Sequence, residues 1–114
     1  MKIVINSDFG GFGLSNEAIR EYGRAKGMNL VEDGPDEYGY IHFYRDAIGE
    51  DSYFTEREID RSDPALVSVV ETMGEASFGK YANLKIVEIP DDVNWYIEEY
   101  DGMEHVAERH RTWR

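Results

Sequence analysis

The segment at residues 93–109, VNWYIEEYDGMEHVAER, places an Asp-Gly pair between two stretches rich in aromatic and apolar residues. Asp-Gly at the centre of such a segment is a strong signal for a two-residue β-hairpin turn. The hairpin would place Glu98 opposite His105 and Asn94 opposite Arg109. A helix starting at Asp101 is the competing interpretation, because Asp101 and Glu104 have capping-box spacing. We favour the hairpin.

The N-terminal part of the chain predicts a strand, a tight loop and a helix. KIVIN at 2–6 is a short run rich in β-branched residues, and SDFGGFG at 7–13 is a glycine-rich loop. Ser15 is a plausible N-cap and Gly27 a natural end for the helix that follows. Its predicted apolar face consists of Leu14, Ala18, Tyr22 and Ala25.

The rest of the chain predicts short strands, one further helix and another strand before the hairpin. Residues 29–54 are aromatic and turn-rich, which favours short strands. In RSDPALVSVVETMG, Asp63 caps a helix that Pro64 begins and Gly74 ends. NLKIVEIP at 83–90 reads as a strand that stops at Pro90. We therefore predict a single α+β domain over residues 1–114, with two helices packed on a mostly antiparallel sheet.

The charge balance limits the classes of partner. Asp and Glu number 24 against 12 Lys and Arg, giving a formal charge of −12, and cysteine is absent. Thiolate catalysis and disulfides are excluded, and a large duplex nucleic-acid interface is disfavoured because it needs a basic surface. We expect no membrane segment and a cytosolic protein. A small anionic ligand in a local basic pocket remains open, as does an acidic inhibitor that mimics nucleic acid and binds a host protein.

Few residues suggest catalysis or metal binding. GGFG at 10–13 precedes a helix, where backbone amides can hold an anion, but we favour a plain tight turn. His105 and Glu98 are better explained as a cross-strand polar pair than as a catalytic dyad. No histidine lies in a recognised metal motif. We predict no enzyme activity, no metal and no cofactor.

The C-terminal segment ERHRTWR concentrates guanidinium groups in an acidic chain. Arg109, Arg111 and Trp113 alternate, so an extended strand would present them on one face. Arginine binds phosphate in bidentate fashion and tryptophan offers a stacking surface, which favours a nucleotide site. The alternative is a solvated terminus neutralised by neighbouring acids.

Three stretches of the chain, MKIVIN…GGFGLS, RSDPALVSVVETMGE and LKIVEIPDDVNWYIEEYDGMEHVAERHRTW, resemble a family of small proteins encoded by phages and prophages. The family is that of the first Thoeris anti-defence protein. Its members are non-enzymatic sponges that sequester cyclic ADP-ribose isomers made by bacterial TIR-domain proteins. They form dimers that associate further, with ligand pockets between protomers. Some members also hold cyclic oligonucleotides at a separate site.

The resemblance implies a homo-oligomer in the cytoplasm of an infected bacterial host, with a ligand pocket of aromatic, amide and arginine side chains. The pocket residues that it implies here are Arg57, Arg61, Tyr81, Asn83, Asn94, Arg109 and Arg111, with Gly10, Gly11 and Phe12 nearby. Relatives often have Cys-Tyr before Gly-Gly-Phe, whereas this chain has Asp8-Phe9. Asp8 would repel a phosphate if it faced the pocket. The aromatic content of 13% also favours a homo-oligomer, because tyrosine and tryptophan are enriched at interfaces.

Overall fold

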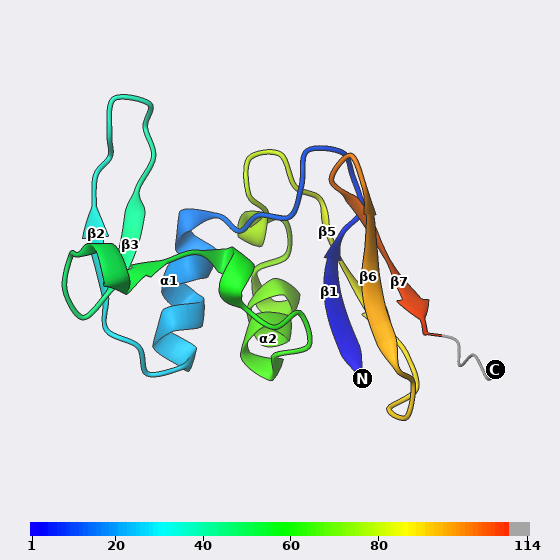
Figure 1. The fold of residues 1–114 in the computed structure, drawn as a ribbon. Helices are drawn as coiled ribbons and strands as arrows, with labels where there is room; N and C mark the ends of the chain where they lie inside the picture. Colours follow the sequence, from blue (N-terminus) through cyan, green and yellow to red (C-terminus); the bar gives the residue numbers. More distant parts are fainter. Residues whose placement is uncertain (110–114) are drawn as a thin grey trace.

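A computed structural model describes residues 1–109, which form two α-helices and seven β-strands (Figure 1). The helices are α1 (Asn16–Ala25) and α2 (Pro64–Met73). The strands are β1 (Lys2–Asn6), β2 (Leu30–Asp33), β3 (His42–Arg45), β4 (Tyr53–Phe54), β5 (Leu84–Glu88), β6 (Trp95–Tyr100) and β7 (Met103–Glu108). Short 3-10 turns occupy Glu50–Ser52 (η1), Glu56–Glu58 (η2) and Gly74–Ser77 (η3). The predicted α+β class is confirmed.

Both helices begin and end where the sequence predicted. The Ser15 hydroxyl accepts a hydrogen bond from the Ala18 N–H at 3.1 Å, and the Asp63 carboxylate accepts one from the Ala65 N–H at 2.9 Å. These caps satisfy amides that have no partner inside the helix. Gly74 ends α2 with a φ of +58°, a conformation that costs glycine little.

The buried face of α1 differs from the predicted one at its C-terminal end. Ala18 and Tyr22 are buried as expected, but Ala25 is exposed and Gly23 is buried instead. A Cβ at Gly23 would lie 2.6 Å from a methyl carbon of Leu30. Glycine, which lowers intrinsic helix stability, therefore lets Leu30 pack this closely against the helix; a larger residue would require the Leu30 side chain to shift.

The strands form three small antiparallel sheets rather than one. The first sheet consists of β1 and β5, and the third consists of β6 and β7. In the second sheet β3 lies between β2 and β4. In the last pair Glu98 lies opposite His105, as predicted, and the Arg109 N–H donates to the Asn94 carbonyl at 2.8 Å. Asp101 and Gly102 have φ of +50° and +89°, which is the geometry of a type I′ turn. The predicted hairpin is confirmed.

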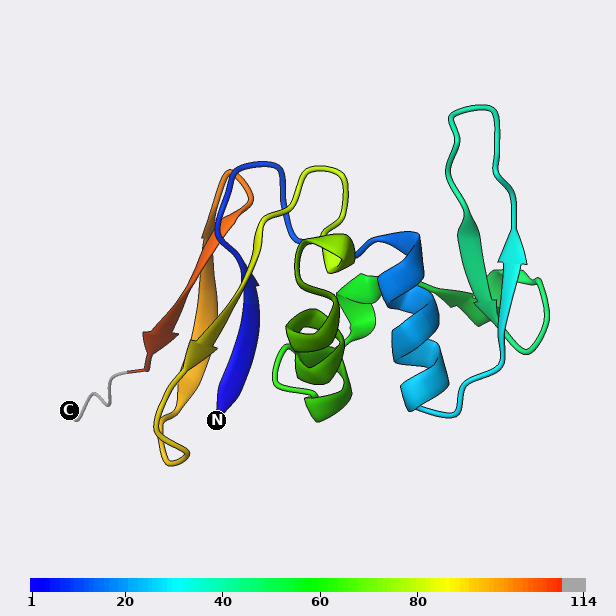
Figure 2. The same cartoon turned by 180° about the vertical axis from the view of Figure 1, so that it is seen from behind.

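The elements follow one another along the longest dimension of the molecule, which measures 51 Å (Figures 1 and 2). The β6–β7 hairpin lies against β1, α2 also packs on β1, and α1 packs on α2. The sheet of β2, β3 and β4 forms the opposite end. Beyond it the loop between β2 and β3 extends away from the body of the protein.

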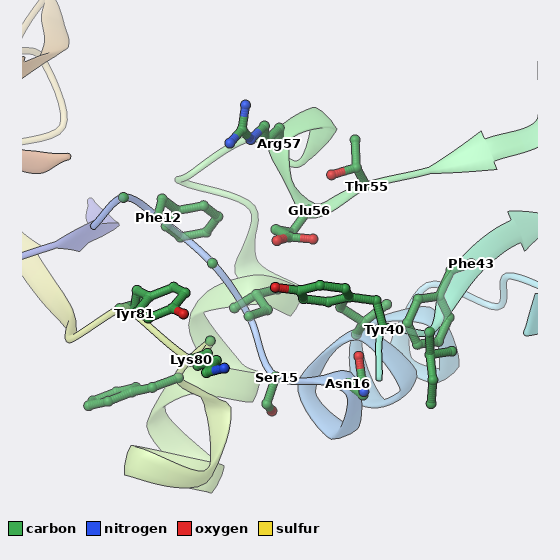
Figure 3. Close-up of a pocket in the computed structure, with 18 of the residues that line it drawn as sticks. Phe12, Ser15, Asn16, Tyr40, Phe43, Thr55, Glu56, Arg57, Lys80 and Tyr81 are labelled. Carbon is green, nitrogen blue, oxygen red and sulfur yellow. The ribbon is translucent and has the colours of Figure 1, made fainter. Parts of the chain in front are cut away.

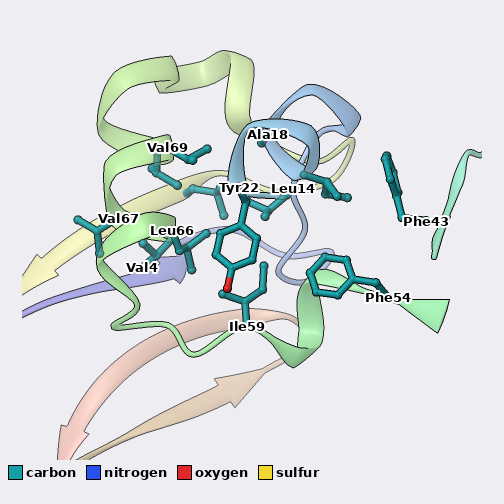
Figure 4. Packing of buried hydrophobic residues seen from close by; sticks show 13 residues of the cluster. Val4, Leu14, Ala18, Tyr22, Phe43, Phe54, Ile59, Leu66, Val67 and Val69 are labelled. Carbon is teal, nitrogen blue, oxygen red and sulfur yellow. The ribbon is translucent and has the colours of Figure 1, made fainter. Parts of the chain in front are cut away.

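One hydrophobic cluster joins the helices to the strands on both sides (Figure 4). Leu66 of α2 and Val4 of β1 are fully buried. At the other end the rings of Tyr22 and Phe54 stack with centroids 6.2 Å apart. The Tyr22 hydroxyl donates to Asp63 at 2.8 Å, which links α1 to the cap of α2. The core therefore holds the glycine-rich loop and the β2–β4 sheet in fixed relation to each other.

Candidate functional site

A cavity of about 690 Å³ opens between the glycine-rich loop and the β2–β4 sheet (Figure 3). Four stretches of chain form its wall: 10–16 with the start of α1, 39–43 with the start of β3, 53–57 with η2, and 78–82 before β5. These stretches are far apart in sequence and come from both sides of the core. The helices and the β2–β4 sheet together therefore determine its shape.

Glycines allow two of these stretches to touch. Gly10 has a φ of +111°, and a Cβ there would lie 2.7 Å from the Tyr81 carbonyl oxygen. The Gly79 N–H donates to the Gly13 carbonyl at 2.9 Å, and a Cβ at Gly79 would lie 2.7 Å from the Gly13 carbonyl carbon. Larger residues would push the two stretches apart. The glycine-rich loop is thus part of the cavity wall as well as a turn.

Two tyrosines of the cavity wall keep much of their surface exposed. Tyr40 is 54% exposed and Tyr81 is 63% exposed. The carboxylate of Asp36 accepts hydrogen bonds from the backbone N–H groups of Tyr38 and Tyr40 at 2.9 and 3.0 Å, which fixes the loop carrying Tyr40. His42 bonds to the same carboxylate at 3.0 Å, and this bond, followed by that from the Tyr40 N–H, lowers the pKa of Asp36.

Two cations, Arg57 and Lys80, and one carboxylate, that of Glu56, line the cavity together with the tyrosine rings. Lys80 has its ammonium 5.4 Å from the Tyr81 ring centroid, and Arg57 lies on η2. At the start of this turn the Glu58 carboxylate accepts the Thr55 N–H at 3.0 Å, and Arg45 donates to the same carboxylate at 2.8 Å. The Arg45 bond is the main reason that the pKa of Glu58 is lowered. Glu58 is thus paired inside the protein and does not line the cavity, whereas Glu56 and Arg57, on the same turn, do.

Half of the ten predicted site residues line this cavity. They are Gly10, Gly11, Phe12, Arg57 and Tyr81. Asp8, whose charge would oppose a phosphate, is not among the lining residues, and its carboxylate accepts the Phe9 N–H at 2.7 Å. The glycine-rich loop therefore contributes its backbone and Phe12 to the cavity without the Asp8 charge.

Arg61 has a different position from the predicted one. Its guanidinium donates two hydrogen bonds to Glu104, at 2.7 and 2.9 Å, and lies 3.5 Å from the centroid of the Phe12 ring. Because both terminal guanidinium nitrogens are engaged with a carboxylate, Arg61 supports the cavity from behind Phe12 and does not line it.

Of the other predicted residues, Asn83, Asn94 and Arg109 lie within residues 1–109, and none of the three lines the cavity. Asn83 follows the lining stretch, and its backbone bonds to Ser7 and Asn6. Asn94 and Arg109 lie at the open end of the β6–β7 hairpin, about 20 Å from its turn at a rise of roughly 3.3 Å per residue. Arg111 and Trp113 lie outside the described residues.

Sequence reasoning missed several lining residues, among them Tyr40, Glu56 and Lys80. Their positions depend on how the fold brings the start of β3, η2 and the stretch before β5 around the glycine-rich loop. The available signal was the stretch rich in tyrosine and glycine at 38–44, whose aromatic residues were assigned to strands. Tyr40 instead precedes β3 and remains exposed.

The candidate catalytic pair lies away from the cavity. His105 and Glu98 are exposed cross-strand partners, with His105 Nε2 2.6 Å from Glu98 Oε2. This agrees with the interpretation as a cross-strand polar pair. The hydrogen bonds from Tyr96 and then His105 lower the pKa of Glu98. Within residues 1–109, no three His, Asp or Glu side chains form a metal-binding group. Neither α-helix in that range has the length and apolar character needed to cross a membrane.

Comparison of the chain with protein-family models, with curated proteins and with solved structures found no match.

Proposed function

We propose that this protein is a non-catalytic viral anti-defence sponge that binds and sequesters a cyclic ADP-ribose-type signalling nucleotide in the cytoplasm of the infected host. The observation that carries the proposal is the cavity itself, which combines exposed tyrosine rings with an arginine and a lysine. The resemblance of the sequence to the Thoeris anti-defence family supplies the ligand class.

The chemistry of the cavity supports a nucleotide. Tyr40 and Tyr81 offer exposed ring faces for an adenine, and Arg57 and Lys80 offer cations for a pyrophosphate. Pockets for small ligands typically enclose about 300–1,000 Å³. The cavity, at about 690 Å³, lies within that range. Both the adenine and the pyrophosphate of a cyclic ADP-ribose isomer therefore have chemical partners in one cavity.

Sequestration places fewer demands on the site than catalysis. A sponge needs tight binding of the ground state, whereas an enzyme must bind the transition state more tightly than the substrate. Aromatic stacking and charge pairing provide ground-state affinity without any reacting group. The proposal therefore assigns binding roles to Tyr40, Tyr81, Arg57 and Lys80 and no role in bond cleavage.

The proposal includes a homo-oligomer. Phe9, Tyr81 and Tyr100 are 56%, 63% and 72% exposed, and Gly10, next to Phe9, donates its N–H to Asp101, next to Tyr100, at 3.3 Å. Large exposed aromatic residues are favoured at protein interfaces. A second chain in this region would also cover the open side of the cavity at Tyr81. Association in this region would also allow Arg109 or Arg111 of a second chain to reach the ligand.

Recovery of unchanged ligand tests sequestration directly. The protein is incubated with cyclic ADP-ribose or an isomer, passed through a filter that retains protein, and then heated. The proposal predicts that the filtrate is depleted before heating and that intact ligand returns after denaturation. Recovery of a converted product would show an enzyme. Failure to deplete any isomer would favour the acidic inhibitor, which predicts a host-protein partner and no small ligand.

A further inference from the structure

The carboxylate of Glu56 points into the cavity rather than toward a partner in the protein. Glu56 lies on η2 and is half-buried, and one of its carboxylate oxygens lies 3.7 Å from the position of a Cβ on Gly13. Within residues 1–109, no hydrogen bond or ion pair reaches this carboxylate. In the view of Figure 3, Glu56 lies between Arg57 and Lys80, which are on different sides of the cavity.

This arrangement contrasts with that of Glu58 on the same turn. Glu58 accepts bonds from the Thr55 N–H and from Arg45, so its charge is compensated inside the protein. The charge of Glu56 has no such compensation in the described part of the chain. A half-buried carboxylate is stabilised by hydrogen-bond donors, and here these are left to water or to a ligand that enters the cavity.

The sign of the charge restricts the ligand further. A purely anionic ligand, such as inorganic pyrophosphate, would gain from Arg57 and Lys80 but would be repelled by Glu56 at the same time. A ligand with separate anionic and donor groups avoids this conflict. The two oxygens of a carboxylate match two adjacent O–H or N–H donors.

We propose that Glu56 is the specificity-determining residue of the cavity, and that it selects nucleotides presenting hydrogen-bond donors over simple polyphosphates. This inference rests on the proposed function. The donors are either the hydroxyls of a ribose or the exocyclic amine of the base. Glu56 accepts from them while Arg57 and Lys80 hold the phosphates.

The test compares wild-type protein with Glu56→Gln by titration calorimetry. The probes are cyclic ADP-ribose, an analogue lacking a ribose hydroxyl, an analogue with a keto group in place of the base amine, and inorganic pyrophosphate. Glu75→Gln removes the same charge at an exposed position outside the cavity and serves as the control. Circular dichroism establishes that each variant is folded.

Glu56→Gln is expected to reduce discrimination among the nucleotides and to increase the affinity for pyrophosphate. Wild-type protein should discriminate against one of the two analogues by about tenfold or more, and Glu56→Gln should lose most of that discrimination. The same variant should bind pyrophosphate more tightly than wild type, and Glu75→Gln should behave as wild type. The analogue that is discriminated against identifies the donor.

Two results would overturn the inference, and they are distinguishable. If wild-type protein binds cyclic ADP-ribose but Glu56→Gln leaves both the analogue ratios and the pyrophosphate affinity unchanged, Glu56 does not determine specificity, and the proposed function stands. If wild-type protein binds none of the nucleotides, the proposed function fails and the role of Glu56 fails with it.

Discussion

Replacing Glu104 with alanine would remove a buried carboxylate that connects the β6–β7 hairpin to the rest of the protein. The side chain of Glu104 is 8% exposed and that of Arg61 is 18% exposed. Glu104 accepts two hydrogen bonds from Arg61, at 2.7 and 2.9 Å, and a third from the Asn6 N–H at 2.8 Å. The substitution leaves the Arg61 guanidinium beside Phe12 without its counter-charge.

The expected loss of stability follows from these contacts. Removing one partner of a buried ion pair costs about 3–5 kcal/mol, because the remaining charge stays desolvated. Arg61 retains some contact with water, which reduces this cost, so we expect a decrease of about 3 kcal/mol in the free energy of unfolding. Glu104→Gln keeps the shape of the side chain and one acceptor oxygen, and it should cost about 1–2 kcal/mol.

Urea unfolding followed by circular dichroism measures the effect, and a double-mutant cycle with Arg61→Leu isolates the coupling between the two side chains. The double variant should be less destabilised than the sum of the single variants. Glu98→Ala, which removes a carboxylate from an exposed cross-strand pair, should barely move the midpoint. A loss below about 1 kcal/mol for Glu104→Ala, with an unchanged urea slope, would show that this ion pair does not anchor the hairpin.

Three further predictions concern a buried hydroxyl, a turn and the cavity cations. Burial, and then the bond to Asp63, raise the pKa of Tyr22 to about 12 from an ordinary value of 10.0. The stabilising contribution of the neutral hydroxyl is therefore complete below pH 10.0 and is lost as the pH rises toward about 12. Tyr22→Phe should therefore reduce the difference between urea midpoints measured at neutral and at alkaline pH; an unchanged difference would contradict this. Gly102→Ala should lower the melting temperature more than Gly39→Ala, because both have positive φ but only at Gly102 would a Cβ meet backbone, 2.3 Å from the Gly11 nitrogen. Equal effects would show that the approach of the hairpin turn to the glycine-rich loop is unimportant. Arg57→Ala and Lys80→Ala should each weaken binding of cyclic ADP-ribose by about tenfold or more in calorimetry, whereas Lys85→Ala, exposed and outside the cavity, should not.

Local signals in the sequence predicted most of the secondary structure. The Asp101-Gly102 turn, the Asp63-Pro64 start and the Gly74 end of α2 each depend on the conformational preferences of the residues themselves. Such preferences act over a few residues, so they are readable without the fold. Gly23 shows their limit, because its presence in α1 is explained by Leu30, which lies in a different element.

The candidate site was less predictable because long-range contacts build it. Gly10, Phe12 and Tyr81 were identified, but Tyr40 lines the cavity only because the end of the β2–β3 loop, next to β3, is placed close to the start of α1 by the fold. Arg61 illustrates the opposite error. An arginine looks available for phosphate in the sequence, yet its partner Glu104 lies 43 residues away and becomes visible only in the fold.

The tyrosines of the β2–β3 loop allow the most direct test of the central claim, which is that the cavity binds the nucleotide. Tyr40 lines the cavity and Tyr38, on the same loop and 76% exposed, does not. Calorimetric titration with cyclic ADP-ribose should show binding by wild type and Tyr38→Ala, and binding at least about fivefold weaker by Tyr40→Ala, since stacking on an aromatic ring contributes about 1–3 kcal/mol per base. Equal affinity in all three proteins, with the fold intact, would contradict the account.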